Sequence, residues 1–464
     1  MNIDKSIPAA VAVLAILALA FWLGGSPVTG LQARLPEADA PKTTSAQVYK
    51  PVAETARTEM FDVIPLPLPG AWPRFRGPDG TGLAEPQPPL ARTWPKSGPP
   101  QLWSIPVGEG HAGAAILDGR VYLLDYDAAA HRDTLRCLSL ETGRDVWRFS
   151  YPVEVLRQYG MSRTVPAVTA DAVVSLGPKC HLTCVDTQTG KLRWAYDLVH
   201  DFGAAVPQWY NGQCPLIDHD RAIIALGAPD ALLAAFDLNT GAIAWKAPNP
   251  HNWKMTHTSV VPLDFNGRRV YLYSASAGLA GVSADDGRIL FETDAWRVTF
   301  ANIPSPIPLG GGRVFLTGGY GAGSAILQLT KRDGRIVPEI VARIDPRTFS
   351  GEQHTPISYQ GHLYGVSDDG QLKCLDTAGR LVWSSGRTAR FGRGGFLIAD
   401  GLIYIMNDGT GELTLAEATP AGYRELARSR VLPGPEAYGP PALAAGRLIV
   451  RNLNTMTCLD VRSK

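Results

Sequence analysis

The chain has 464 residues, of which 45% are hydrophobic, and its 44 lysines and arginines nearly balance its 43 aspartates and glutamates, leaving a net charge of +1. This composition is typical of a globular protein that buries a large core. The balanced charge and the lack of a basic recognition helix give no indication of a nucleic-acid partner.

The first element in chain order is the uncharged run Ile7–Gly25, which follows Lys5. A bilayer crossing takes about 20 apolar residues, so residues 1–25 are expected to form a transmembrane signal anchor or a signal peptide. Ala18-Leu19-Ala20 resembles a signal-peptidase site, whereas the bulky residues after it favour an uncleaved anchor. Either alternative predicts that the rest of the chain lies in the cell envelope, outside the cytoplasm.

Residues 26–70 are rich in proline, alanine, threonine and charge. Such a stretch buries little apolar surface and stays extended. We therefore predict a flexible tether, and a folded domain over residues 71–464.

That domain contains eight copies of one repeat, in which a Thr-Gly, Asp-Gly or Ala-Gly turn is followed four residues later by tryptophan or a substitute. Successive members of the tryptophan position are 43 to 51 residues apart. They are Trp103, Trp147, Trp194, Trp245, Phe291, Pro338, Trp383 and Leu426. Self-similarity at this period is typical of propeller blades with four antiparallel strands. Hairpin turns at Asp118-Gly119, Asn266-Gly267 and Asp400-Gly401 fall at matching places in their repeats.

The last repeat lacks the strand that carries the tryptophan. The strand that contains Trp103, at the start of the domain, is not preceded by the other three strands of a repeat. A ring closes when the N-terminal segment supplies the missing outer strand, which also removes exposed sheet edges. The predicted fold is therefore all-β, an eight-bladed propeller closed by the N-terminal segment and preceded by one transmembrane helix. A monomer is expected.

The repeat Leu-x-Cys/Ala-x-Asp-x-x-Thr-Gly-x-x-x-Trp resembles the pyrroloquinoline quinone (PQQ) type propeller repeat of quinoprotein dehydrogenases and of BamB-like envelope propellers. The leader Trp72–Gly82 (Trp-Pro-Arg-Phe-Arg-Gly-Pro-Asp-Gly-Thr-Gly) is similar to the opening of many uncharacterised secreted propellers of that superfamily. The resemblance covers roughly residues 71–464 and implies a fold, because the same blades serve enzymes and scaffolds.

A binding site is expected where the first strand of each blade begins, since loops from all blades converge there around the channel. Counting eight residues back from the first turn of a blade gives His111, Arg163, Arg393 and Tyr438, and the loops of the other blades place four further residues close by. Together they form a polar, aromatic and partly cationic set of ligand or partner residues. The set is His111, Arg163, Trp209, His257, Asn302, His354, Arg393 and Tyr438. Such a ring is suited to an anionic ligand or an acidic peptide. The alternative is that these residues only solvate the channel mouth.

Four of the six cysteines precede the third-strand aspartate of their blades and are expected to be buried as small apolar side chains: Cys137, Cys184, Cys374 and Cys458. Cys180 and Cys214 fall in loops of neighbouring blades on one face, which makes a disulfide between them a hypothesis. The glycine-rich segment Gly318–Gly323 lies between two strands and is expected to be a hairpin rather than a phosphate-binding loop. No catalytic motif and no metal-binding motif is found.

Three functions follow from the sequence. The short blades favour a membrane-tethered interaction or assembly scaffold with an envelope protein or peptide partner and no cofactor. A sugar- or peptide-binding propeller would use Trp209, Trp253 and Tyr438 as stacking surfaces. A PQQ-dependent dehydrogenase would hold PQQ and calcium in the channel, although no residue is assigned to that role.

Overall fold

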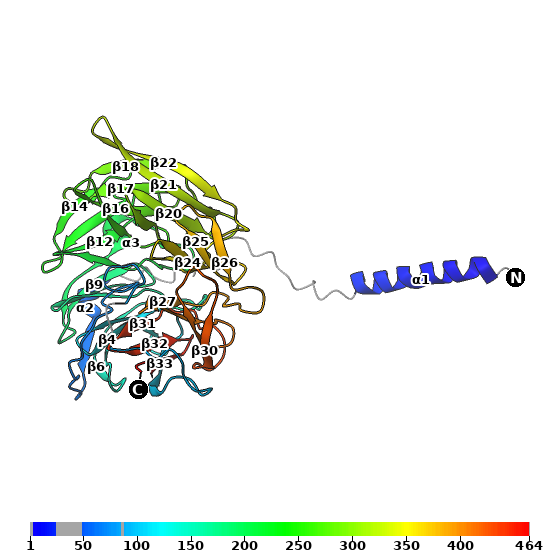
Figure 1. Ribbon diagram of the computed structural model, residues 1–464, viewed down its shortest axis with the longest axis horizontal. Helices are drawn as coiled ribbons and strands as arrows, with labels where there is room; N and C mark the ends of the chain where they lie inside the picture. Colours follow the sequence, from blue (N-terminus) through cyan, green and yellow to red (C-terminus); the bar gives the residue numbers. More distant parts are fainter. Residues whose placement is uncertain (1–2, 25–48, 85–87, 464) are drawn as a thin grey trace. The chain divides into compact units, whose positions relative to one another are not determined.

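The computed structural model describes residues 3–24, 49–84 and 88–463, with side chains in the first range described only for residues 12–22. These residues divide into two units, one within Met1–Tyr49 and one spanning Lys50–Lys464 (Figure 1). The first contains the helix α1 (Ile3–Gly24), and the second contains the β-propeller.

The described residues form eight antiparallel sheets, seven of four strands and one of five. Blade one contains β3 (Ala114–Leu117), β4 (Arg120–Asp127), β5 (Arg132–Ser139) and β6 (Asp145–Pro152). Blade two contains β7 (Ala167–Val168), β8 (Ala172–Leu176), β9 (His181–Asp186) and β10 (Leu192–Asp197), followed by α3 (Leu198–Phe202). Blade three contains β11 (Leu216–Asp218), β12 (Arg221–Ala225), β13 (Leu233–Asp237) and β14 (Ile243–Ala247). Blade four contains β15 (Val261–Phe265), β16 (Arg268–Ala275), β17 (Gly278–Ser283) and β18 (Ile289–Thr293).

Blade five contains β19 (Ile307–Gly310), β20 (Arg313–Gly318), β21 (Gly323–Arg332) and β22 (Arg335–Ile344). Blade six contains β23 (Ile357–Tyr359), β24 (His362–Val366), β25 (Leu372–Asp376) and β26 (Leu381–Ser384). Blade seven contains β27 (Phe396–Ala399), β28 (Leu402–Met406), β29 (Glu412–Glu417) and β30 (Glu425–Arg430). Blade eight contains β31 (Ala442–Ala444), β32 (Arg447–Arg451), β33 (Thr455–Asp460) and β2 (Gln101–Pro106).

The ring closes as predicted. Strand β2 pairs antiparallel with β33, so that Trp103 lies opposite Cys458 and supplies the outer strand that the last repeat lacks. The hairpin turns at Asp118, Asn266 and Asp400 also match the prediction, because each residue and the glycine after it have positive φ. The eight-bladed, four-stranded propeller is therefore confirmed.

Tryptophan and glycine recur together because each pair joins neighbouring blades. The indole Nε1 of Trp147 in blade one donates to the carbonyl of Thr187 in blade two at 3.1 Å. A Cβ atom on Gly190, which has a φ of +64°, would lie 2.6 Å from the same indole. The turn thus needs glycine both for its left-handed backbone and for the close approach of the ring. Trp103, Trp194 and Trp245 repeat this arrangement with the next blade.

Two assignments of the tryptophan position are wrong. The tryptophan position lies at a β-bulge between the third and fourth strands of a blade. In blade five this bulge falls at Ile326, whose partner is Ala342 rather than Pro338. Strands β21 and β22 are ten residues each, so the Asp333-Gly334 turn is displaced outward and counting from Gly334 ends too early. This long hairpin projects at the top of Figure 1. In blade seven Leu415 pairs with Ala427, one residue beyond the predicted Leu426.

The predicted tether extends too far. Residues 25–48 lie outside the described range, but residues 50–70 belong to the propeller unit. The helix α2 (Val52–Thr55) and the strand β1 (Arg57–Met60) occur here, and β1 pairs with β6 as a fifth strand of blade one. Pairing with β6 fixes this segment on the edge of blade one.

Helix α1 lies within the predicted signal segment, of which residues 1, 2 and 25 are outside the described residues. Among the described residues, no helix is long and apolar enough to cross a bilayer. The predicted transmembrane helix therefore gains no support here.

The leader Trp72–Gly82 crosses the central channel. Trp72 bridges to Ile116 in blade one, and the Arg76 guanidinium donates to the carbonyls of Thr355 and Pro356 beside blade six. The next residue after the leader, Leu83, bridges to Ile398 in blade seven. The segment therefore links blade one to blades six and seven and forms a floor within the channel.

Candidate functional site

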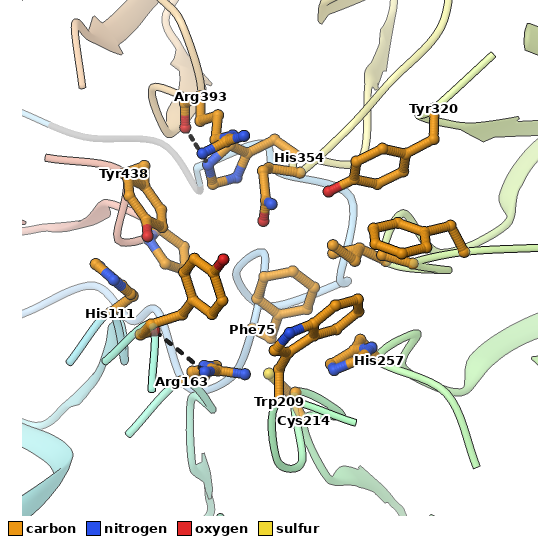
Figure 2. Close-up of a pocket in the computed structure, with 17 residues that line it drawn as sticks. Phe75, His111, Arg163, Trp209, Cys214, His257, Tyr320, His354, Arg393 and Tyr438 are labelled. Atoms are coloured by element: carbon orange, nitrogen blue, oxygen red, sulfur yellow. Dashed lines mark hydrogen bonds between the residues drawn. The ribbon is translucent and has the colours of Figure 1, made fainter. Parts of the chain in front are cut away.

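A cavity of about 360 Å³ lies at the channel mouth, above this floor (Figure 2). Most of its wall comes from the loops that precede the inner strands of the blades, with Phe75 added from the leader and Tyr320 from the hairpin between β20 and β21. The lining residues are Phe75, His111, Tyr159, Arg163, Trp209, Gly212, Cys214, His257, Phe300, Ala301, Ile303, Tyr320, Gln353, His354, Arg393, Tyr438 and Pro440.

Seven of the eight residues chosen from the sequence line this one cavity, and Asn302 does not. Asn302 is buried, and its Nδ2 donates to the Ser274 hydroxyl at 3.1 Å and to the Ser274 carbonyl at 3.2 Å. Its neighbours Ala301 and Ile303 face the cavity instead. The position of a residue in this loop does not tell which of the adjacent side chains faces the cavity.

Arg163 carries a charge that no described carboxylate neutralises. Its Nη2 donates to the backbone carbonyls of Gln158, Tyr159 and Gly160 at 2.7, 3.1 and 3.2 Å. Its Nε and Nη1 donate to no described group. Burial lowers the pKa of the guanidinium to about 10, so the side chain remains cationic at neutral pH. A partly buried cation without a counter-ion favours an anion in the cavity.

The second cationic residue in the wall, Arg393, is already paired. Its Nη2 and Nε lie 2.8 Å from Oε1 of Glu352, and this carboxylate is the largest influence that raises the pKa of the guanidinium. Arg393 therefore adds no net positive charge to the cavity.

The three histidines in the wall are neutral at physiological pH. Burial lowers the pKa of His111 to about 3 and that of His257 and His354 to about 4. His111 Nε2 lies 3.5 Å from Glu436, but the lowered pKa means that this contact is not an ion pair at neutral pH. His354 Nε2 lies 2.9 Å from the Arg393 carbonyl and must donate its proton there, leaving Nδ1 as an acceptor.

Burial of His111 predicts an acid dependence of stability. Its folded pKa lies below its unfolded value of 6.5, so the unfolded chain binds the extra proton between the two values. The contribution of His111 is fully present above pH 6.5 and is lost as the pH falls toward 3, at about 1.4 kcal/mol per pH unit. We expect denaturant unfolding of His111→Gln to show an acid loss about 1–2 kcal/mol smaller than wild type between pH 7.5 and 5.

Asp133 acts in the opposite sense, since burial raises its pKa to about 7. It is present in both proteins and cancels in the comparison. If the free energies of unfolding of wild type and variant changed in parallel with pH, His111 would have the same pKa in the folded and the unfolded state, which would contradict the prediction.

Aromatic side chains that sequence counting missed form a ledge on the cavity. The rings of Trp209 and Phe300 are 5.0 Å apart between centroids, and those of Phe300 and Tyr320 are 4.8 Å apart. Phe300 is 58% exposed and Tyr320 49% exposed. Tyr320 lies on the predicted glycine hairpin between β20 and β21, which the structure confirms. For Phe300, two residues before Asn302, the only indication in the sequence was that it is aromatic.

The backbone beside the aromatic ledge is strained at Trp209, whereas Trp253 lies outside the cavity wall. Trp209 and Tyr210 both adopt left-handed backbone conformations, with φ of +64° and +71°. For residues with a Cβ atom this conformation costs about 1–3 kcal/mol and is concentrated at functional sites. Trp253 does not belong to the wall, because it is 7% exposed and packs in the core between blades three and four. Its expected stacking role is therefore wrong.

The hypothetical disulfide is absent from the structure, which shows Cys180 and Cys214 as buried free thiols. Cys180 packs in the core between blades two and three, while Cys214 packs between blades one and two. Cys214 Sγ accepts from the backbone N–H of Val165 at 3.2 Å, which directs it away from Cys180. The other four cysteines are fully buried, as predicted.

We expect peptide mapping under non-reducing conditions to recover both Cys180 and Cys214 as free thiols. Burial raises the pKa of each to about 12, so reaction with a thiol reagent should require unfolding. A linked pair of peptides would contradict the structure.

The residues do not fit the calcium of the PQQ-dependent alternative. Calcium binds 6 to 8 oxygen ligands that include carboxylates. The wall contains neither aspartate nor glutamate, and the described residues hold no cluster of three metal-binding side chains. No reaction step through PQQ follows from this site.

The fold and site define an eight-bladed propeller with a cationic and aromatic cavity at its channel mouth. The family model described as outer membrane protein assembly factor BamB matches residues 94–206, 131–293 and 229–356, which together cover more than half of the chain. The chain belongs to this family. No curated protein matches the sequence.

Solved structures share the fold at low identity. BamB from Moraxella catarrhalis is 14% identical with a TM-score of 0.53, over 78% of this chain and 100% of that one. The quinohemoprotein alcohol dehydrogenase ADHIIG from Pseudomonas putida HK5 is 12% identical with a TM-score of 0.56, over 86% and 81%. The computationally designed Ika8 protein is 11% identical with a TM-score of 0.51, over 78% and 100%. These likenesses concern the fold alone.

Proposed function

We propose that this protein is a non-enzymatic recognition propeller of the cell envelope, which binds an anionic group of its ligand or partner in the channel-mouth cavity. The observation that carries the proposal is Arg163, a cation in the cavity wall with two unused donor nitrogens and no described carboxylate partner. A bound anion would accept hydrogen bonds from these nitrogens and neutralise the charge.

Attachment to the membrane through the run Ile7–Gly25, with the propeller outside the cytoplasm, is part of the proposal. It is supported by the uncharged composition of the run and by Lys5 before it. Protease protection of the full chain in intact cells, with the propeller cleaved only after the cytoplasm is opened, would contradict it.

The binding proposal is tested by calorimetric titration of the full chain with a short acidic peptide and with its neutral amide counterpart. We expect Arg163→Gln to weaken binding of the acidic peptide about ten- to hundredfold, because a hydrogen bond to a charged group contributes about 1.5–3 kcal/mol. The matched control is Arg347→Gln, an exposed arginine paired with Asp345 away from the cavity. Equal loss in both variants, or equal binding of the acidic and neutral peptides, would contradict the proposal.

An interaction scaffold is the second candidate, and the exposed aromatic side chains at the cavity mouth favour it. Tyr159 is 71% exposed, in addition to Phe300 and Tyr320. Exposed aromatic clusters bordered by polar groups mark protein contact sites. In this role the ledge would contact a partner surface while Arg163 pairs with one of its acidic side chains.

A further inference from the structure

We infer that the cavity takes a small organic anion with a single negative charge and a flat aromatic body. This inference rests on the proposed anion-binding function and narrows it to one ligand class. Three features of the wall carry it: a net charge of one, a buried polar group without a partner, and the aromatic ledge.

The charge of the wall matches one anionic group. Arg163 and Arg393 are the cationic lining residues, and Glu352 already neutralises Arg393 at 2.8 Å. A ligand with two or three carboxylates would leave charge without a counter-ion in a partly buried site, which is strongly unfavourable. A monoanion leaves the cavity neutral.

His111 supplies a second polar anchor. Its side chain is more than nine-tenths buried, lines the cavity, and has no hydrogen-bond partner on either ring nitrogen, although Nε2 lies 3.5 Å from the Glu436 carboxylate. Its ring stacks on Tyr438 with 3.9 Å between centroids, which fixes its orientation. Figure 2 shows His111 and Arg163 on the same side of the cavity. A buried polar group without a partner is unfavourable, so a ligand that bonds to it is favoured.

The ledge supplies the apolar surface. Trp209, Phe300 and Tyr320 follow one another in edge-to-face contacts, and Phe300 and Tyr320 expose about half of their surface. An aromatic ring placed on Phe300 would continue this series at the separation that aromatic pairs prefer. The volume of about 360 Å³ is near the lower end for ligand cavities, which span about 300–1,000 Å³, so the body holds one or two rings.

The test is calorimetric titration of the full chain with four probes. These are 3-phenylpropionate, its neutral amide, propionate, and benzene-1,3,5-tricarboxylate. We expect 3-phenylpropionate to bind at least tenfold more tightly than each of the other three. In Arg163→Gln the acid and the amide should bind equally, and in Phe300→Ala the aromatic acid should lose affinity while propionate is unchanged. Arg347→Gln should behave as wild type.

The outcomes separate this inference from the proposed function. Tighter binding of the tricarboxylate, or equal binding of propionate, overturns the ligand class. Binding of the acidic peptide through Arg163 without binding of 3-phenylpropionate also overturns it, while the proposed function stands. Equal binding of the acid and the amide to wild type overturns both, and this comparison does not depend on the folding of any variant.

Discussion

Replacing Trp147 by alanine is expected to lower the free energy of unfolding by about 3–5 kcal/mol, the range for truncating a fully buried aromatic side chain. Trp147 is 0% exposed, whereas Trp194 and Trp245 in the same position are 8% exposed. Strand β1 adds to its cover, since Met60 pairs with Trp147. The variant opens a cavity between blades one and two and removes the hydrogen bond to Thr187. Denaturant unfolding monitored by circular dichroism measures the loss.

Two matched variants show the origin of this effect. Trp147→Phe keeps most of the ring and loses the hydrogen bond, so it should cost about 1–2 kcal/mol. Trp383→Ala changes the same repeat position at a less buried site in blade six and should cost less than Trp147→Ala. A loss below 1 kcal/mol for Trp147→Ala would show that tryptophan is not what joins the blades.

Replacing Arg451 by methionine is expected to destabilise the fold by about 3–5 kcal/mol, because several buried carbonyls lose their donor and each such loss costs about 1–3 kcal/mol. Arg451 is 2% exposed and lies on β32 of blade eight. This strand is next to β33, which pairs with β2 to close the ring. Its guanidinium donates to the carbonyls of Ala112 and Gly108, which precede blade one, at 3.2 and 3.0 Å. It also donates to the carbonyls of Asn452 and Leu453. Methionine fills the volume but leaves these buried acceptors without donors.

The control for this variant is Arg447→Met on the same strand. Arg447 is less buried and donates to the carbonyl of Ala445 at 3.4 Å, so its replacement should change stability by less than about 1 kcal/mol. Equal stability of the two variants in denaturant unfolding would mean that the contacts of Arg451 with Gly108 and Ala112 do not stabilise the closed ring.

The fold could be predicted because the residues that recur in the repeat are needed both for the turns within a blade and for the contacts between blades. The turn glycine and the tryptophan recur at positions set by contact with the next blade, as Gly190 and Trp147 show. The prediction failed where a hairpin changed length, as in β21 and β22, because counting from a turn assumes a fixed distance to the bulge. Strand β1 was missed because its pairing with β6 is long-range and its sequence has no alternating apolar pattern.

The cavity was partly predictable for the same reason. The residues before each inner strand lie at a fixed distance from the first turn, which identified Arg163 and His111. Phe75 reaches the cavity from the leader, and Tyr320 reaches it from a hairpin in blade five, neither of which that count includes. The neutral state of His111 and the pairing of Arg393 with Glu352 depend on burial and on contacts between loops, which have no signal in the spacing.

The most direct measurement of the anion site is a crystal structure of the full chain with 3-(4-bromophenyl)propionate, located by the anomalous signal of bromine. We expect one bromine peak beside Trp209, Phe300 and Tyr320, with the carboxylate within hydrogen-bond distance of the Arg163 guanidinium. A ligand that binds in solution but lies elsewhere in the crystal, or whose carboxylate points away from Arg163, would contradict it.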